Sequence, residues 1–295
     1  ERERLEHETL AIINENKGAS AKSAQILVDM LATYEAHRAL RFQQRIRSHR
    51  VRATQKVANF QTYFIDLVHD KEVRGVSRRL IMGVFYAFSL IYEQLVNFKL
   101  AMYRWGWVKK EQLPCFVISL GNVTVGGTGK TPTAQHLARA IHEMGYRVAI
   151  LNRGYRAKWR GEVGIVSDGH TLKMDAETAG DEAFMLAKHL PDVPVLIGPK
   201  RAVTGRYAIE HFGAEVAILD DGYQHWQLVR DMDILLVDAV NVFGNGYLLP
   251  RGTLREPLSH IDRADVCLMT KVDQAAPGAI RHIWETFRSY NQDGL

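Results

Sequence analysis

A glycine-rich segment at residues 121–131, with the sequence GNVTVGGTGKT, has the residue types that bind nucleotide phosphates. Glycines let the backbone curl so that its N–H groups and the start of a following helix point at phosphate oxygens, and Lys130 adds a positive charge. The hydroxyl of Thr131 can ligate Mg²⁺. The expected contacts are Thr124, Val125, Gly126, Gly127, Thr128, Gly129, Lys130 and Thr131. The first of these eight positions is usually glycine and is a threonine in this chain.

Acidic residues that could handle a metal ion or a proton stand at two other places. Asp220 and Asp221 directly follow the apolar run 216–219, so we expect them at the carboxyl edge of a sheet. One of them could hold Mg²⁺ directly or through water, and an ordinary turn starting with Asp-Asp-Gly is the alternative. Asp181 opens a helix, where it could accept a proton from an attacking hydroxyl or simply cap the helix.

Two basic segments are expected near the same edge. Residues 152–155 (NRGY) directly follow a predicted strand and therefore face the edge that carries the acidic residues. Residues 250–257 (PRGTLREP) form a rigid, charged loop in which an arginine could stabilise a phosphate in transfer. An ordinary surface loop with internal ion pairs is the alternative. His225 has no second His or Cys at metal-ligand spacing, so we interpret it as a hydrogen-bonded structural residue.

Short apolar strands alternate with helices from residue 114 onward, and these elements must position the side chains named above. Strands are predicted at 115–120, 148–151, 193–197, 216–219, 234–237 and 266–269, and helices at 130–144, 182–189 and 201–211. Strands that are apolar throughout and separated by helices are typical of a parallel sheet covered on both faces. We therefore predict an α/β fold with a mostly parallel sheet and helices on both faces.

The composition excludes several classes of protein. With 295 residues, 46% of them apolar and 24% charged, the chain is long enough for a core and is neither disordered, collagen-like nor disulfide-stapled. Its two cysteines, Cys115 and Cys267, lie in apolar runs and are predicted to be buried free thiols in a reducing compartment. No secretory signal opens the sequence.

The basic character belongs to the N-terminal third. Residues 1–113 hold 19 lysines and arginines against 12 acids, whereas the rest hold 19 against 21. Six arginines lie between Arg38 and Arg52, either on a solvated helix face or on a strip that meets phosphates of lipid or nucleic acid. The uncharged run 80–92 is short for a bilayer span and has cations and aromatic rings around it, so we predict a helix at a membrane surface. A buried helix packed on the following domain is the alternative.

Five motifs in order, GNVTVGGTGKT, NRGY, AGDE, DDGYQH and RGTLREP, resemble the tetraacyldisaccharide 4'-kinase family of lipid A biosynthesis over about residues 75–275. The resemblance implies a P-loop NTPase-type fold and a membrane-associated kinase. Such an enzyme moves the γ-phosphate of ATP onto the 4'-hydroxyl of an acylated disaccharide 1-phosphate, giving lipid IVA. The expected cofactors are ATP and Mg²⁺, and the expected location is the cytoplasmic leaflet of the bacterial inner membrane, with no nucleic acid partner.

The same resemblance assigns roles to residues of this chain. Lys130 and Thr131 become the phosphate and Mg²⁺ contacts, and Asp181 the base for the sugar hydroxyl. Asp220 and Asp221 would bind the metal. Arg255 and Glu256 would help to order the nucleotide and metal site, Arg255 as a catalytic residue and Glu256 as a further metal ligand. The residues expected near the disaccharide are Asn152, Arg153 and Tyr155.

The chain departs from the family at both ends. The family continues into a C-terminal lobe with an Asp-His-His-type motif, which this sequence does not contain. Residues 1–34 faintly resemble the tail of Kdo transferases, which would imply a fused transferase and kinase. We therefore divide the chain into a helical leader at 1–34, a basic membrane-interface segment at 35–113 and a kinase domain at 114–295.

Two other functions are compatible with parts of the sequence. Residues 270–273 (TKVD) resemble the signature by which GTP-hydrolysing switches and metallochaperones bind guanine. A preference for GTP over ATP would favour that interpretation. A non-catalytic, membrane-bound nucleotide-binding scaffold is the third possibility, and it is supported only by the C-terminal departure.

Overall fold

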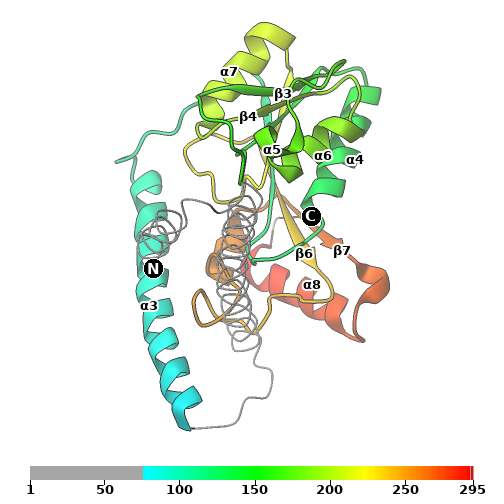
Figure 1. Cartoon of the computed structure of the whole chain (residues 1–295). Coiled ribbons are helices and arrows are strands. Elements are labelled where there is room, and N and C mark those ends of the chain that lie inside the picture. Colours follow the sequence, from blue (N-terminus) through cyan, green and yellow to red (C-terminus); the bar gives the residue numbers. More distant parts are fainter. Residues whose placement is uncertain (1–75, 293, 295) are drawn as a thin grey trace, which may run out of the picture. The chain divides into compact units, whose positions relative to one another are not determined.

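The computed structural model describes residues 76–292 and 294 (Figure 1). The chain divides into two units, Glu1–Asp66 and Leu67–Leu295, and all of the described residues belong to the second. The predicted leader at 1–34 and the arginine strip between Arg38 and Arg52 lie outside the described residues. Our domain limits therefore remain predictions.

A sheet of seven strands forms the centre of the second unit, in the order β3-β4-β2-β5-β1-β6-β7. All neighbouring strands are parallel except β3 and β4, which pair antiparallel. The strands are β1 Phe116–Gly121, β2 Val148–Asn152, β3 Gly164–Asp168, β4 Pro194–Ile197, β5 Val216–Asp220, β6 Met232–Asp238 and β7 Val266–Thr270. The predicted mostly parallel α/β sheet is confirmed.

The six predicted strands are all present, with ends that differ from the predictions by two residues at most. The sequence analysis missed β3, because only two of its five residues, Ile165 and Val166, are large and apolar, and it ends in the polar residues Ser167 and Asp168. The predicted helices are also present, as α4 Lys130–Glu143, α6 Asp181–His189 and α7 Arg201–Phe212. The elements α5 Ala176–Ala179, α8 Ala279–Tyr290, η1 Leu258–Arg263 and η2 Val272–Gln274 were not predicted.

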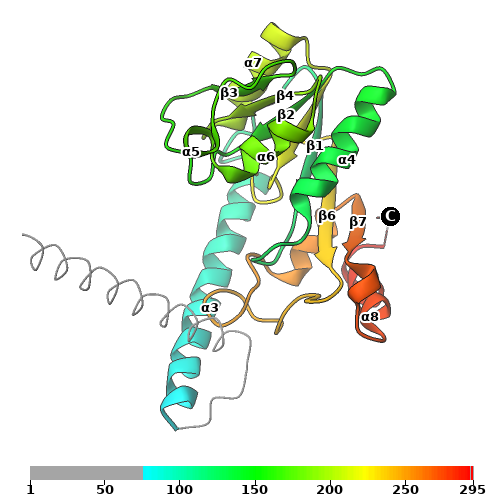
Figure 2. The same cartoon turned by 45° about the vertical axis from the view of Figure 1, so that its right-hand side comes forward.

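Helices cover both faces of the sheet, and alternation along the strands decides which residue faces which layer (Figure 2). In β2, Val148 and Ile150 pack in the core cluster that includes residues of α4 and α6, whereas Ala149 and Leu151 pack in the cluster under α7. Helix α8 covers the other end of the α7 face, where it buries Phe287 against β6. Burial on both faces explains why these strands are apolar throughout.

A long helix, α3 Val76–Arg104, precedes the sheet and stands apart from the helices that cover it (Figures 1 and 2). It continues 12 residues beyond the uncharged run 80–92 on which its prediction rested. Residues Arg79–Arg104 are long and apolar enough to cross a membrane, by length and composition alone. Near its C-terminal end, Leu100 and Tyr103 pack on Trp226 of the sheet domain. The buried-helix alternative therefore describes only a few residues of α3.

The two cysteines are free, as predicted, but neither is fully buried. Cys115, which precedes β1, and Cys267, in the edge strand β7, are both half-buried. Burial raises the pKa of both thiols to about 11. Both therefore stay protonated and unreactive at neutral pH.

Candidate active site

The glycine-rich segment connects β1 to α4 at the carboxyl edge of the sheet, between the ends of β5 and β6. Gly126 and Gly129 adopt φ angles of 121° and 78°, which non-glycine residues rarely tolerate. Thr124 instead forms an antiparallel bridge with Leu254, and the N–H of Val125 donates to Thr253 O at 2.8 Å. The loop is extended at Thr124, so that position does not need the glycine that usually stands there.

Lys130, the first residue of α4, lies over the carboxyl edge of β1 and β5. Its Nζ donates to Asn122 Oδ1 at 3.4 Å and lies 3.5 Å from Asp221 Oδ1. The amide of Asn122 is itself held by a 2.7 Å hydrogen bond to Thr124 O. The ammonium group of Lys130 is therefore held between the start of the loop and Asp221.

The two acidic residues that follow β5 have different environments. Asp220 is 2% exposed; its Oδ2 accepts a 2.7 Å hydrogen bond from Asn152, and its Oδ1 has no partner among the described residues. Burial raises the pKa of Asp220 to about 6, although the Asn152 hydrogen bond acts in the opposite direction. A buried carboxylate oxygen without a partner fits a site that receives a cation.

Asp221 turns the other way, with φ of 53°, and pairs with the basic residues of the site. Its Oδ1 lies 2.9 Å from Arg255 and 3.5 Å from Lys130. Burial acts to raise the pKa of Asp221, but the charges of Lys130 and Arg255 outweigh it and lower the pKa. Asp221 therefore does more than form a turn, because its carboxylate pairs with Lys130 at the end of the phosphate loop and with Arg255 of the 250–257 segment.

Asp181 and Thr131 lie near each other. They line one cavity of about 460 Å³ beside the start of α4, with Glu182. Asp181 is the first residue of α6 and is exposed, and Gly180 before it has φ of 86°. A Cβ at position 180 would lie 2.6 Å from Tyr155 O, so only glycine fits there. Asp181 thus faces the cavity from a fixed turn.

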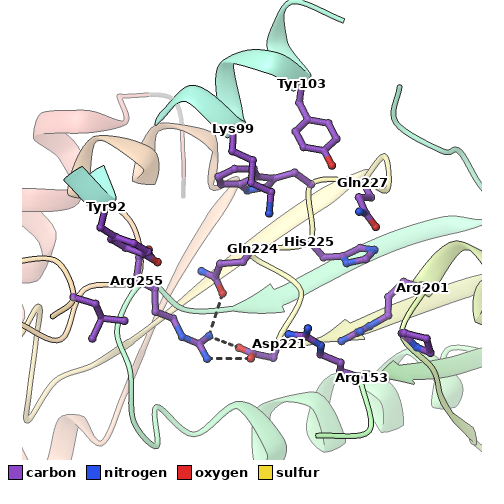
Figure 3. Close-up of a pocket in the computed structure, with 13 residues that line it drawn as sticks. Tyr92, Lys99, Tyr103, Arg153, Arg201, Asp221, Gln224, His225, Gln227 and Arg255 are labelled. Atoms are coloured by element: carbon purple, nitrogen blue, oxygen red, sulfur yellow. Dashed lines mark hydrogen bonds and ion pairs between the residues drawn. The ribbon is translucent and has the colours of Figure 1, made fainter. Parts of the chain in front are cut away.

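A second cavity of about 460 Å³ lies between α3 and the sheet edge and is rich in basic side chains (Figure 3). Lys99, Arg153, Arg201 and Arg255 line it, and Asp221 is the one acidic residue among the described residues of its lining. Arg201 is 3% exposed and its Nε has no partner among the described residues. Burial, reinforced by Arg153, lowers the pKa of Arg201 to about 10, so it stays charged at neutral pH. This cavity suits an anionic group.

His225 also lines the basic cavity, which our structural interpretation did not foresee. Burial, and then the charge of Arg201, lower the pKa of His225 to about 4. The ring is therefore neutral at neutral pH and can offer a hydrogen bond without adding charge. Sequence reasoning also missed Arg201 and Lys99. Arg201 could have been found, because it follows a predicted strand at the same edge as Asn152.

Asn152 and Arg153 reach the site, whereas Tyr155 stands outside it. Asn152 is buried and holds Asp220, while its Oδ1 accepts from the N–H of Gly154 at 2.8 Å. Arg153 lines the basic cavity. Tyr155 is exposed, with Arg156 over its ring, and lines neither cavity. Its role next to a disaccharide therefore stays a prediction.

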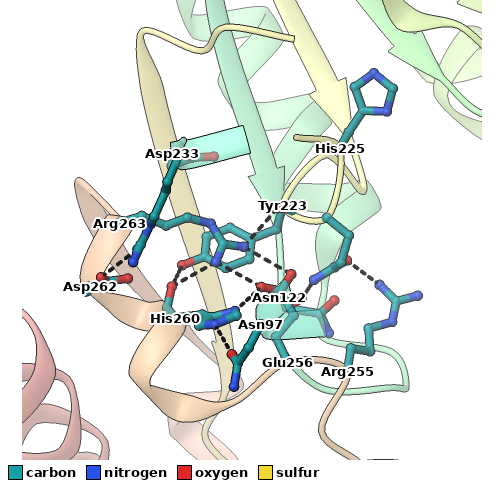
Figure 4. A network of polar contacts seen from close by, with 12 residues as sticks. Asn97, Asn122, Tyr223, His225, Asp233, Arg255, Glu256, His260, Asp262 and Arg263 are labelled. Atoms are coloured by element: carbon teal, nitrogen blue, oxygen red, sulfur yellow. Dashed lines mark hydrogen bonds and ion pairs between the residues drawn. The ribbon is translucent and has the colours of Figure 1, made fainter. Parts of the chain in front are cut away.

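The structure separates Arg255 from its neighbour Glu256. Arg255 points into the basic cavity, where it donates to Asp221 and, at 3.1 Å, to Gln224 (Figure 3). Glu256 points the other way into a buried polar network with His260 and Arg263, at 3.0 and 2.8 Å (Figure 4). Both of its oxygens have basic partners, so Glu256 is not placed with the other predicted metal ligands. It instead fixes the segment that carries Arg255.

The network around Glu256 also reaches α3. His260 Nε2 lies 2.8 Å from Asn97 Oδ1, and the hydroxyl of Tyr92 donates to Arg255 O at 2.9 Å. These contacts attach the apolar helix to the loop that carries Arg255. The long helix and the basic cavity are therefore parts of one arrangement.

Among residues 76–292, no group of three or more His, Cys, Asp or Glu side chains could hold a metal ion alone. Magnesium is commonly bound by one or two carboxylates, with the remaining positions filled by water and phosphate oxygens. Asp220, with its free oxygen, and Thr131 at the start of α4 meet that smaller requirement.

Comparison with known proteins identifies the family. A family model described as tetraacyldisaccharide-1-P 4'-kinase matches residues 82–292. The chain belongs to this kinase family. A curated tetraacyldisaccharide 4'-kinase from Pelobacter propionicus is 45% identical over 204 residues, which are 69% of this chain and 56% of the relative. Another from Halothermothrix orenii is 38% identical over 80% of this chain and 61% of its own length.

A solved structure extends the comparison to the fold. The crystal structure of LpxK from Aquifex aeolicus in complex with ATP matches with a TM-score of 0.61 and 42% identity, over 65% of this chain and 60% of that chain. This chain thus spans about half to three-fifths of the length of the kinases it matches. The motif-based prediction of family and fold is confirmed.

Proposed function

We propose that this chain carries the core of an ATP-dependent kinase that phosphorylates the 4'-hydroxyl of an acylated disaccharide 1-phosphate, giving lipid IVA. The observation that carries the proposal is the meeting of three features at one sheet edge. A phosphate loop, a cavity with a carboxylate at Asp181 and a basic cavity around Arg201 adjoin one another there. Family membership and the likeness to an ATP complex support the same reaction.

The chemistry required of the protein is mainly placement and charge neutralisation. Lys130 and the loop N–H groups hold the phosphates of ATP, and Arg255 offsets charge that develops on the transferred group. The sugar oxygen forms a bond to the γ-phosphorus as the bond from that phosphorus to the bridging oxygen of the leaving ADP breaks. Asp181 orients the hydroxyl and takes its proton.

Mg²⁺, when bound, would neutralise charge on the phosphate oxygens. Thr131 and Asp220 would hold it, because Asp220 presents a buried oxygen that no described residue satisfies. Asp221 is already paired with Lys130 and Arg255, so its role is to keep these two basic side chains in position.

The basic cavity supports an anionic acceptor. Arg153, Arg201 and Lys99 supply at least three positive charges around a space that contains one carboxylate. An arginine that is buried, charged and left with an unpartnered Nε is costly unless an anion completes it. We assign the cavity to the phosphorylated end of the acceptor, with Arg153 in its lining and the exposed Tyr155 outside it toward the sugars, while the buried Asn152 acts only by holding Asp220.

Helix α3 supports a location at the membrane. Large apolar side chains are exposed along it, and Trp105 and Trp107 follow its end. Such a mixture suits the cytoplasmic surface of the bacterial inner membrane, where the acceptor's acyl chains can stay in the leaflet. Removing them would cost about 0.8 kcal/mol for each CH₂.

The experiment follows transfer of labelled phosphate from [γ-³²P]ATP to the acylated disaccharide 1-phosphate in mixed micelles. We expect Lys130→Met and Asp181→Asn to lose at least about 100-fold in turnover. Lys173→Met is the matched control, because Lys173 makes an ion pair with Asp168 on the edge strand β3. Wild-type turnover by Asp181→Asn would remove that residue from the mechanism, and a strong preference for GTP would favour a switch protein.

A further inference from the structure

The end of β7 contacts the outer side of the phosphate loop. Thr270 is the last residue of β7, and Lys271 follows with φ of 55° before η2 begins. The hydroxyl of Thr270 donates to Thr128 O at 3.0 Å, and Nζ of Lys271 donates to Gly127 O at 2.8 Å. Two consecutive loop carbonyls therefore receive donors from two consecutive residues of a distant strand.

The donor side of this contact is anchored in the core of the sheet. Nζ of Lys271 also lies 2.7 Å from Oδ2 of Asp238, the last residue of β6. Asp238 is buried, and its other oxygen accepts from the N–H of Val240 at 2.9 Å. Burial acts to raise the pKa of Asp238, but its hydrogen bonds, with Lys271 first among them, outweigh burial and lower the pKa, so the Asp238 carboxylate is ionised at neutral pH.

Two glycines in the middle of the loop, Gly126 and Gly127, lie in open space. A Cβ placed at Gly126 or Gly127 would meet no described atom within 4 Å. A Cβ at Gly129, in contrast, would lie 3.4 Å from the methyl group of Thr270. Since side-chain packing does not fix Gly126 and Gly127, hydrogen bonds to the loop carbonyls must fix this stretch of backbone.

This arrangement matters for phosphate binding because of how a peptide group is built. The C=O and the N–H of one trans peptide unit point in opposite directions, so N–H groups aimed at phosphates leave the carbonyls of the same units on the outside. A donor on an outer carbonyl holds the N–H direction before the ligand arrives. Preorganised donors bind an anion more tightly than donors that must first be ordered.

We infer that Thr270 and Lys271 are positioning residues that brace the phosphate loop for nucleotide binding, an inference that rests on the proposed function. The TKVD segment then has a use that does not require guanine. Its first two residues act on the loop backbone, while Asp273, whose carboxylate would select guanine, is exposed on η2. The bracing serves ATP and GTP equally, because it acts on the phosphate side.

The test measures ATP binding to the purified chain by titration calorimetry with Mg²⁺, together with the melting temperature without nucleotide. Losing a hydrogen bond from a charged donor weakens binding about tenfold, and losing a neutral one about fivefold. We therefore expect Lys271→Met to raise the Kd for ATP about tenfold and Thr270→Val about fivefold. Thr270→Ser keeps the hydroxyl and should bind within about twofold of the wild type.

Two controls separate bracing from general stability and from base recognition. Lys173→Met removes an ion pair of similar length at β3 and should leave the Kd unchanged. Asp273→Ala should alter neither the ATP nor the GTP affinity. In the kinase assay, Lys271→Met should raise the KM for ATP more than it lowers kcat, which a fold defect would not do.

The outcomes distinguish the inference from the function on which it rests. If the wild-type chain binds no ATP, the proposed nucleotide site fails and the bracing fails with it. If the wild type binds and Lys271→Met binds equally well, the bracing alone is refuted. A loss in Thr270→Ser as large as that in Thr270→Val would also refute it, because any change of packing at position 270 would then weaken binding, whether or not the hydroxyl is present.

Discussion

Replacing Asp220 with asparagine tests whether this carboxylate is kept for a cation at the expense of stability. The side chain is 2% exposed, and only Oδ2 has a partner, the amide of Asn152. Burial, partly opposed by that hydrogen bond, raises the pKa of Asp220 from 3.8 to about 6. Without a ligand, the folded chain therefore carries a buried charge that the unfolded chain holds in water.

The size and sign of the effect follow from that pKa. Since the unfolded chain loses the proton first, stability falls as the pH rises from about 4 to about 6 and is then constant. A pKa difference of about 2 corresponds to about 3 kcal/mol at pH 8. Asparagine removes this penalty but leaves an unpaired buried amide N–H group in place of Oδ1, which costs about 1–3 kcal/mol.

Asp220→Asn should therefore be as stable as the wild type or up to about 2 kcal/mol more stable at pH 8. At pH 4.5 the free energy of unfolding of the variant relative to the wild type should be about 2 kcal/mol lower than at pH 8, because most of the wild-type penalty is absent at the lower pH. Urea unfolding with EDTA at both pH values measures the difference. Asp221→Asn is the control and should be less stable than the wild type at pH 8, because Asp221 pairs with Lys130 and Arg255.

The reasoning also predicts the effect on ligand binding. Asp220→Asn should bind ATP with Mg²⁺ at least about tenfold more weakly, because a neutral amide is a poorer Mg²⁺ ligand than a carboxylate. A variant that is less stable than the wild type by the same amount at both pH values would refute the argument. Asp220 would then be a structural residue and not one reserved for a cation.

Three further predictions concern stability. Burial and nearby arginines lower the pKa of His225 from 6.5 to about 4. As the pH falls, the unfolded chain therefore takes up a proton before the folded chain does, and stability is lost between pH 6.5 and about pH 4. The wild type should lose about 2 kcal/mol more than His225→Asn between pH 7 and pH 5 in urea titrations, and parallel losses would contradict this. Glu256→Gln should cost about 3 kcal/mol in urea unfolding because it leaves buried cations unpaired, whereas Glu215→Gln at an exposed pair should cost under about 1 kcal/mol. Gly121→Ala should lower the melting temperature strongly, since its Cβ would lie 2.7 Å from that of Tyr223, and an unchanged value would mean that the strand can shift.

The parts of this site that are local in sequence were predictable. A phosphate loop needs glycines, a lysine and a hydroxyl within a few residues, and it must join a strand to a helix. Asp220 and Asn152 each end an apolar strand, and parallel strands bring their carboxyl ends to one edge. Local pattern and strand direction therefore determined which residues meet, without any knowledge of distances.

Contacts between distant segments were decided only by the tertiary structure. Arg255 and Glu256 are adjacent in the sequence, and both were predicted to act at the nucleotide and metal site. In the structure Arg255 points into the basic cavity, whereas Glu256 points into a buried network. Residue type shows neither this division nor the burial of Arg201. Charge and spacing in a sequence determine what a residue can do, whereas its direction and partners depend on how the chain packs, because electrostatic and hydrogen-bond energies change steeply over a few ångströms.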